Sequence, residues 1–277
     1  MHELPLVIFT VLSQIAVGAL FTMWIVDLKG GILNVKLGKG LAISIFALAT
    51  VAILASIFHL GHPLQAYKAL LNVQTSWLSR EIWLFSLMLL TMIGYIFTWS
   101  EGKESQRRIV GAFSSLFGLI AVMASAMIYV LPAMPAWNNF SPIFFFVMTG
   151  VLLGPLYVGV VLYFFDKESL NLWKVAPLMA LVYAMSSFFY ITVLFSGTGT
   201  LAATADNIIN HPMFVFRGLL SWIIPVVVLL PFFFLKVKKK PAMMLVAIVF
   251  ILAFAGEIIG REIFYNTIVE LDINQID

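Results

Sequence analysis

The chain has 277 residues, of which 62% are hydrophobic and 10% are charged, and it contains no cysteine. This composition excludes a soluble globular protein with an ordinary polar surface, and the lack of thiols excludes disulfides, thiolate metal sites and an iron–sulfur cluster held by this chain. The formal net charge is +3. We do not interpret this excess of basic residues as a sign of a nucleic-acid partner, because the distribution of these residues across a membrane, described below, explains it.

Eight long apolar segments follow one another along the sequence. A bilayer core of about 30 Å needs roughly 20 apolar residues in a helix, and continuous rather than alternating apolar runs favour helices over a β-barrel. We therefore predict an all-α integral membrane protein, with a single transmembrane domain over residues 1–277 that forms a bundle of eight transmembrane helices. The predicted spans are approximately 4–27, 40–62, 80–99, 108–130, 141–166, 173–195, 212–235 and 241–262.

The lysines and arginines fall mainly on one side of these spans. Four lie on the other side, namely Lys68, Arg80, Arg217 and Arg261. The remaining twelve are Lys29, Lys36, Lys39, Lys103, Arg107, Arg108, Lys167, Lys174, Lys236, Lys238, Lys239 and Lys240. Because basic residues in short loops stay in the cytoplasm, both termini are predicted to be periplasmic or extracellular, in the cell membrane of a bacterium or archaeon.

The two predicted sides differ in other respects. The longer connections, 63–79 and 196–211, and the tail 263–277 lie on the outer side, where they suit a docking surface for a partner. Asp27 and Asp166 end helices on the inner side, and we interpret them as interfacial charges.

The second predicted helix ends with two histidines on one face, His59 and His62. His2 and His211 also fall on the outer side, so the inner half of the bundle offers no axial ligand for a transmembrane pair of haems. His62 and His211 each precede a proline at a helix boundary and are interpreted as interfacial residues. His59 lies deeper, where an ionisable group favours a functional role.

The third predicted helix opens with Arg80-Glu81-Ile82, and the eighth closes on a second Arg-Glu-Ile triplet that begins at Arg261. Glu257 and Arg261 are spaced i, i+4, so they share a helix face and are expected to form a local ion pair. A purely structural interpretation also exists, since Glu81 suits a helix N-terminus and Arg261 a helix C-terminus.

Two such triplets at one depth, with His59 on a third helix end, predict a polar pocket beneath an aromatic collar. A quinol would suit this pocket, because its ring needs an apolar slot and its hydroxyls need acceptors such as His59 and Glu81. The positive charge of Arg80 or Arg261 would tune the proton affinity of the Glu81 carboxylate.

Four short motifs in this order resemble the membrane anchor subunit of bacterial dimethyl sulfoxide reductase and related molybdenum oxidoreductases. They are Glu3-Leu4-Pro5-Leu6, His59-Leu60-Gly61-His62-Pro63, Ser79-Arg80-Glu81 and Gly260-Arg261-Glu262-Ile263-Phe264-Tyr265. The resemblance covers the whole chain, and the eight-helix layout agrees with it.

The resemblance implies a subunit that binds menaquinol near the periplasmic face. Electrons would pass to an iron–sulfur subunit and on to a molybdopterin catalytic subunit, while this chain itself would hold no haem, iron–sulfur cluster or molybdenum. Quinol-binding roles carry over to His59 and Glu81, with Gly61 shaping the pocket and Tyr67 where an aromatic residue is expected. Gln65 stands where the family suggests an arginine.

Two alternatives stay open from the sequence. A secondary transporter could also have eight helices, although transport sites usually place polar groups near the midplane rather than at one rim. A quinol-oxidising cytochrome subunit would hold one haem at the outer rim through two of His59, His62 and His211.

Overall fold

The computed structural model describes residues 4–30, 33–57, 68–164, 171–234 and 239–271, and within these ranges every regular element is helical. Eight helical segments in the described part are long and apolar enough to cross a membrane. The first five are α1 (Leu4–Lys29), α2 (Val35–Ile57), α3 (Trp77–Thr98), α4 (Glu104–Met127) and α5 (Ser141–Phe164). The eight helices expected from the apolar segments are therefore present.

The other three spans are less regular. The sixth joins a 3-10 turn, η2 (Asn171–Lys174), to α6 (Val175–Ser196), and the eighth lies within α10 (Lys239–Asn266). The seventh is built from α8 (Phe214–Arg217), a π turn η3 (Gly218–Ile223), α9 (Ile224–Leu229) and η4 (Leu230–Phe233). Pro225 lies at the start of α9 and has no backbone donor, which explains why the regular ladder changes there.

One short helix was not predicted. The connection 196–211 was expected to be a loop, but it contains α7 (Thr200–Ile209). Thr204, Ala205 and Ile208 are buried on one face of this helix. Its length of 10 residues is too short for a membrane span, so the apolar pattern did not reveal it.

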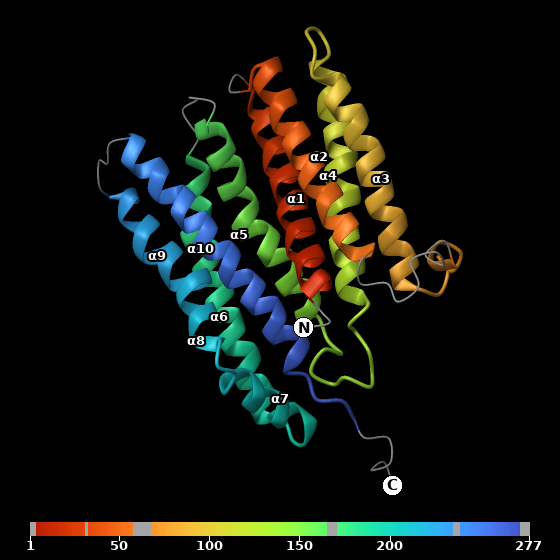
Figure 1. Cartoon of the computed structure of the whole chain (residues 1–277), viewed down its shortest axis with the longest axis vertical. Helices are drawn as coiled ribbons and strands as arrows, with labels where there is room; N and C mark the ends of the chain where they lie inside the picture. The colour runs from red at the N-terminus through yellow and green to blue at the C-terminus, as the bar shows by residue number, and fades with distance from the viewer. Residues whose placement is uncertain (1–3, 31–32, 58–67, 165–170, 235–238, 272–277) are drawn as a thin grey trace.

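The long helices run antiparallel to their neighbours in sequence, so α1 begins and α10 ends at the same end of the bundle (Figure 1). We call this end the termini side. The opposite end, where α1 finishes at Lys29 and α4 starts at Glu104, is called the lysine side.

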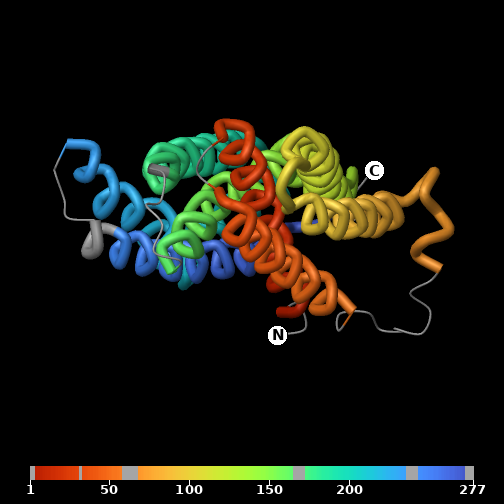
Figure 2. Tube along the Cα trace, turned by 90° about the horizontal axis from the view of Figure 1, so that it is seen from above, coloured from red at the N-terminus to blue at the C-terminus, as the bar shows by residue number. Residues whose placement is uncertain are grey.

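Helix α1 is central, and it contacts α2, α4, α5 and α10. Seen along the bundle, α3 and α4 lie to one side of it and the second half of the chain to the other (Figure 2). A side chain at Gly18 would collide with the carbonyl of Gly150, and one at Gly154 would collide with Gly18. The small-xxx-small spacing of Gly150 and Gly154 therefore brings α5 into backbone contact with α1.

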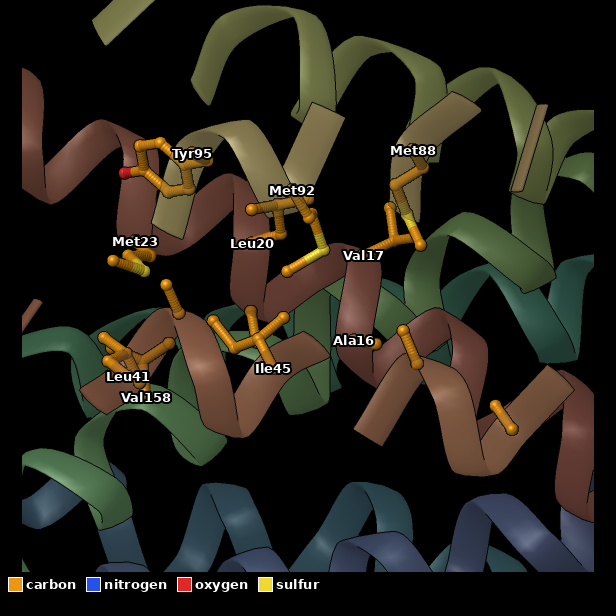
Figure 3. Close-up of a cluster of buried hydrophobic side chains, with 14 of the residues drawn as sticks. Ala16, Val17, Leu20, Met23, Leu41, Ile45, Met88, Met92, Tyr95 and Val158 are labelled. Atoms are coloured by element: carbon orange, nitrogen blue, oxygen red, sulfur yellow. The ribbon is translucent and has the colours of Figure 1, made fainter. Parts of the chain in front are cut away.

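Two hydrophobic clusters lie on either side of the α1–α5 contact. The first joins α1, α2, α3 and α5 through side chains such as Leu20, Ile45 and Met92 (Figure 3). The second joins α5, α6 and α10 through side chains such as Leu152 and Val246. The bundle is thus two packed halves that share their central pair of helices.

Asp27 is not the interfacial charge that the sequence suggested. Its side chain is 3% exposed and pairs with Arg107, whose Nη2 lies 2.7 Å from Oδ1 and whose Nε lies 2.9 Å from Oδ2. The guanidinium also lies over the Trp99 ring, with Cζ 4.1 Å from the ring centroid. Arg107 is 80 residues away from Asp27 in sequence, so no local sequence pattern predicts this buried ion pair. Asp166 lies outside the described residues.

Candidate functional site

The structure describes four of the seven predicted site residues. His59, Gly61 and Tyr67 lie outside the described residues, so their predicted roles stay predictions. Arg80 points to the loop before α3, where it donates to the carbonyls of Val73 (2.9 Å) and Gln74 (2.6 Å). It therefore holds the loop backbone and makes no described contact with a carboxylate.

Glu81 is a carboxylate inside the bundle, near the start of α3. Its side chain is 4% exposed, and Ser125 Oγ on α4 donates a hydrogen bond to Oε1. Ser76 caps α3 and accepts from the Ser79 backbone N–H at 3.4 Å, which fixes the first turn of the helix. The capped turn and the serine hold a carboxylate where ionisable groups are costly.

A pair of tyrosines lies beside Glu81. The hydroxyls of Tyr129, which follows α4, and Tyr265, near the end of α10, are 3.0 Å apart. Burial raises the pKa of Tyr129 well above its ordinary value of 10.0; Tyr265 and the charge of Glu81 raise it further, while Arg261 lowers it. Tyr129 is therefore neutral at physiological pH and lies within electrostatic range of both Glu81 and Arg261.

Aromatic rings form the walls around this tyrosine pair. Trp137 stacks on Phe264 with ring centroids 4.5 Å apart and an interplanar angle of 15°. Tyr129 contacts both rings, at 5.4 Å and 5.5 Å, and also Phe146 at 5.6 Å. These rings come from α5, α10 and the segment between α4 and α5, and they pack around the Tyr129 ring.

Arg261 is buried without a carboxylate partner among the described contacts. It is 4% exposed; its Nη2 donates to Gln14 Oε1 at 2.8 Å, and its Cζ lies 3.7 Å from the Phe146 ring centroid. The expected ion pair with Glu257 is not found in the described part of the chain, because Arg261 is turned toward α1. We call Glu81, Ser125, Tyr129, Tyr265 and Arg261 the termini-side cluster.

Glu257 faces a different part of the bundle. It is 2% exposed, and its Oε2 accepts from Thr149 Oγ1 at 2.6 Å and from the Tyr183 hydroxyl at 3.2 Å. Arg217 Nη2 donates to the same tyrosine hydroxyl at 3.3 Å. A cavity of about 50 Å³ is lined by Tyr183, Arg217, Glu257 and Arg261, among others. It has room for one or two water molecules, which would suit the Oε1 of Glu257, an atom without a partner among the described residues.

The termini-side cluster combines three kinds of chemical group. Glu81 offers carboxylate oxygens, the tyrosine pair supplies neutral hydroxyls, and Arg261 adds a positive charge next to flat apolar walls. These groups have the chemistry that a planar ring with acidic hydroxyl groups requires.

Sequence reasoning missed Ser125, Tyr129 and Gln14, and it quoted Tyr265 only as part of a motif. Gln14 gave the clearest signal, because it is an amide in the middle of the first apolar span.

The comparisons with known proteins cover nearly the whole sequence. Residues 1–267 match the family described as "DMSO reductase anchor subunit (DmsC)". The YnfH subunit of an anaerobic dimethyl sulfoxide reductase from Escherichia coli (strain K12) is 27% identical, over 96% of this sequence and 94% of the relative. A subunit of the anaerobic dimethyl sulfoxide reductase from Haemophilus influenzae is 27% identical, over 96% and 95%. A second subunit of this kind from Escherichia coli (strain K12) is 28% identical, over 96% and 94%.

Proposed function

This protein belongs to the DMSO reductase anchor subunit (DmsC) family, and on that premise we propose that it oxidises menaquinol and passes the electrons to an iron–sulfur subunit, which feeds a molybdopterin catalytic subunit. The family and the eight apolar helices make it a multi-pass integral membrane protein that anchors a DMSO reductase complex, consistent with the bacterial inner membrane. The quinol type and the two partner subunits are parts of the proposal.

The observation that carries the proposal is the buried carboxylate of Glu81. Its hydrogen-bond partner is the Ser125 hydroxyl, and it lies near a neutral tyrosine pair and the positive charge of Arg261. A buried carboxylate held in place by a hydroxyl donor is a suitable acceptor for the proton of a bound hydroxyl group.

The proposed reaction converts a quinol to a quinone with the release of two protons and two electrons. Glu81 accepts the proton of one ring hydroxyl, and the predicted contact His59 accepts the other. Arg261 favours the loss of these protons, because its positive charge stabilises the negative charge that develops on the ring oxygens. The electrons leave to the iron–sulfur subunit, and the protons leave to water on the termini side.

We further propose that the termini side faces outward and that the partner subunits dock there. The uneven distribution of lysine and arginine supports this orientation. A reporter that is active only outside the cytoplasm should be active when fused to the C-terminus and inactive when inserted in the loop near Lys238. Activity of the second fusion alone would reverse the orientation.

Glu81→Gln in the assembled complex tests the site directly. The amide keeps the shape but accepts no proton, so we expect quinol-driven acceptor reduction to fall at least about 100-fold. The control is Glu101→Gln, an exposed carboxylate after α3, which should retain the normal rate. Equal amounts of complex in the membrane must be confirmed by immunoblot. A normal rate in Glu81→Gln would refute the proposed site.

A further inference from the structure

A long apolar groove follows α1, bounded by α4, α5 and the start of α6. Its volume is about 610 Å³, and most of its lining is aliphatic or aromatic. Gln14, Val122 and Phe146 line the end nearer the termini side, and Lys29 and Val175 line the end at the lysine side. At a rise of about 1.5 Å per residue, the groove covers about 22 Å of α1. We call it the α1 groove.

The α1 groove has exposed apolar residues at its edge. Phe21, Ile25 and Val175 are 40%, 36% and 38% exposed, and they form part of its edge. Its floor includes Gly18 and Gly150, where α1 and α5 touch through their backbones. An apolar chain can therefore enter from the bilayer and lie along the helix without displacing a core side chain.

Gln14 lines the end of the groove nearer the termini side and carries an unused hydrogen-bond donor. Gln14 is 1% exposed, and its Oε1 faces Arg261 because a guanidinium offers donors alone. This fixes the amide orientation and leaves Nε2 buried with no partner among the described atoms. Leaving such a donor unpaired is unfavourable, and an oxygen atom of a bound molecule would satisfy it.

The same end of the groove adjoins the termini-side cluster. Val122 lines the groove, and Ser125, which donates to Glu81, lies three residues further along the same face of α4. Phe146 lines the groove as well and contacts the Tyr129 ring. A ring placed at Gln14 would therefore lie next to the proton acceptor of the proposed reaction.

We propose that the α1 groove binds the polyprenyl tail of the quinol, with a ring oxygen accepting a hydrogen bond from Gln14 Nε2. This inference rests on the proposed function and deepens it, because it places the whole molecule and not only its ring. The tail extends along α1 toward Lys29, and the edge at Phe21 and Ile25 is the entrance from the membrane.

The depth of Gln14 selects a quinol over a phospholipid. Gln14 follows the first residue of α1 by ten positions, which is about 15 Å along the helix. A phosphate group at this depth would have to leave the aqueous interface at high cost, whereas an uncharged ring would not. A neutral head with a long apolar tail matches both the donor and the groove.

Blocking the groove should affect long-tailed quinols selectively. Val151 lines the groove from α5 and is only partly buried, so Val151→Trp fills the groove from a wall that can accept a larger side chain. Displacing two tail methylenes weakens binding about tenfold. We therefore expect KM for a long-tailed menaquinol to rise about tenfold in the assembled complex, and KM for tailless menadiol to change less than about twofold.

Two further variants guard against a folding artefact. Leu119→Trp blocks the same groove from α4 and should repeat the effect. Val182→Trp adds the same ring to a lipid-facing position of α6 that is 42% exposed and does not line the groove, so it should change neither KM. Equal changes for both quinols, or none for either, would overturn the tail assignment. Glu81→Gln, measured with both quinols, decides the proposed function separately.

A readout without turnover completes the test. A polyprenyl probe with a diazirine group, photolysed with the purified complex, should cross-link to α1 and α5. The cross-links should be lost in Val151→Trp and kept in Val182→Trp. Cross-links confined to other helices would overturn the inference whatever the activity of the variants.

Discussion

The buried pair between Asp27 and Arg107 gives a stability prediction that does not depend on function. Arg107→Met leaves a carboxylate that is 3% exposed with no cation beside it, and Asp27→Leu leaves an unpaired guanidinium. Removing one member of a buried ion pair typically costs about 3–5 kcal/mol. Asp27 is two residues from the end of α1, where water can approach, so we expect the lower limit, about 3 kcal/mol.

The two single variants should not be equal. Arg107 also lies over the Trp99 ring, and losing this contact adds about 1 kcal/mol to the cost of Arg107→Met. The double variant, Asp27→Leu with Arg107→Met, removes both charges and keeps apolar volume. It should be more stable than either single variant, because no buried charge is left without a partner.

The assay is unfolding of the full chain in mixed micelles, followed by tryptophan fluorescence during titration with a denaturing detergent. A loss of about 3 kcal/mol shifts the ratio of folded to unfolded protein by about 100-fold. Lys103→Met, an exposed change before α4, is the control and should stay within about 0.5 kcal/mol of wild type. Additive effects of the two single changes in the double variant would refute the reasoning.

Two further predictions concern the site and the helix contact. Ser125→Ala removes the described hydrogen-bond donor to Glu81. Since a hydrogen bond to a charged group is worth about 1.5–3 kcal/mol, quinol oxidation should slow at least about tenfold in a complex that still assembles. An unchanged rate would argue against a role of this hydrogen bond in the reaction. Gly154→Ala places a Cβ against the Gly18 backbone and should sharply lower accumulation in the membrane. A Cβ at Gly159 meets no atom within 4 Å, so Gly159→Ala should accumulate normally, as an immunoblot of membranes will show.

The sequence predicted the helices well because each transmembrane segment must satisfy its backbone hydrogen bonds internally, so an apolar run of sufficient length leaves little choice. Helix α7 was missed because its ten residues mix buried and exposed positions in a connection that otherwise resembles a loop. A transmembrane helix is recognised in the sequence by its length and its continuous apolar run, and α7 has neither feature.

The site was predicted in outline only. The sequence placed Glu81 and Arg261 at one depth, and the structure brings both within electrostatic range of Tyr129. It did not foresee that Arg261 binds Gln14 instead of Glu257, since helical spacing shows which residues share a face but not which neighbouring helix that face meets. These contacts depend on the order in which eight helices pack, which no local pattern encodes.

The hydrogen bond from Arg261 to Gln14 connects the last long helix to the first, across 247 positions of sequence. During synthesis the amino-terminal helix therefore enters the bilayer long before its polar partner has been translated. A message that stops before α10 yields a product with a buried amide and an incomplete termini-side cluster, so quality-control proteases should clear such fragments. Only the complete polypeptide can form the whole bundle, so the proposed electron transfer requires a chain that has been synthesised to its end.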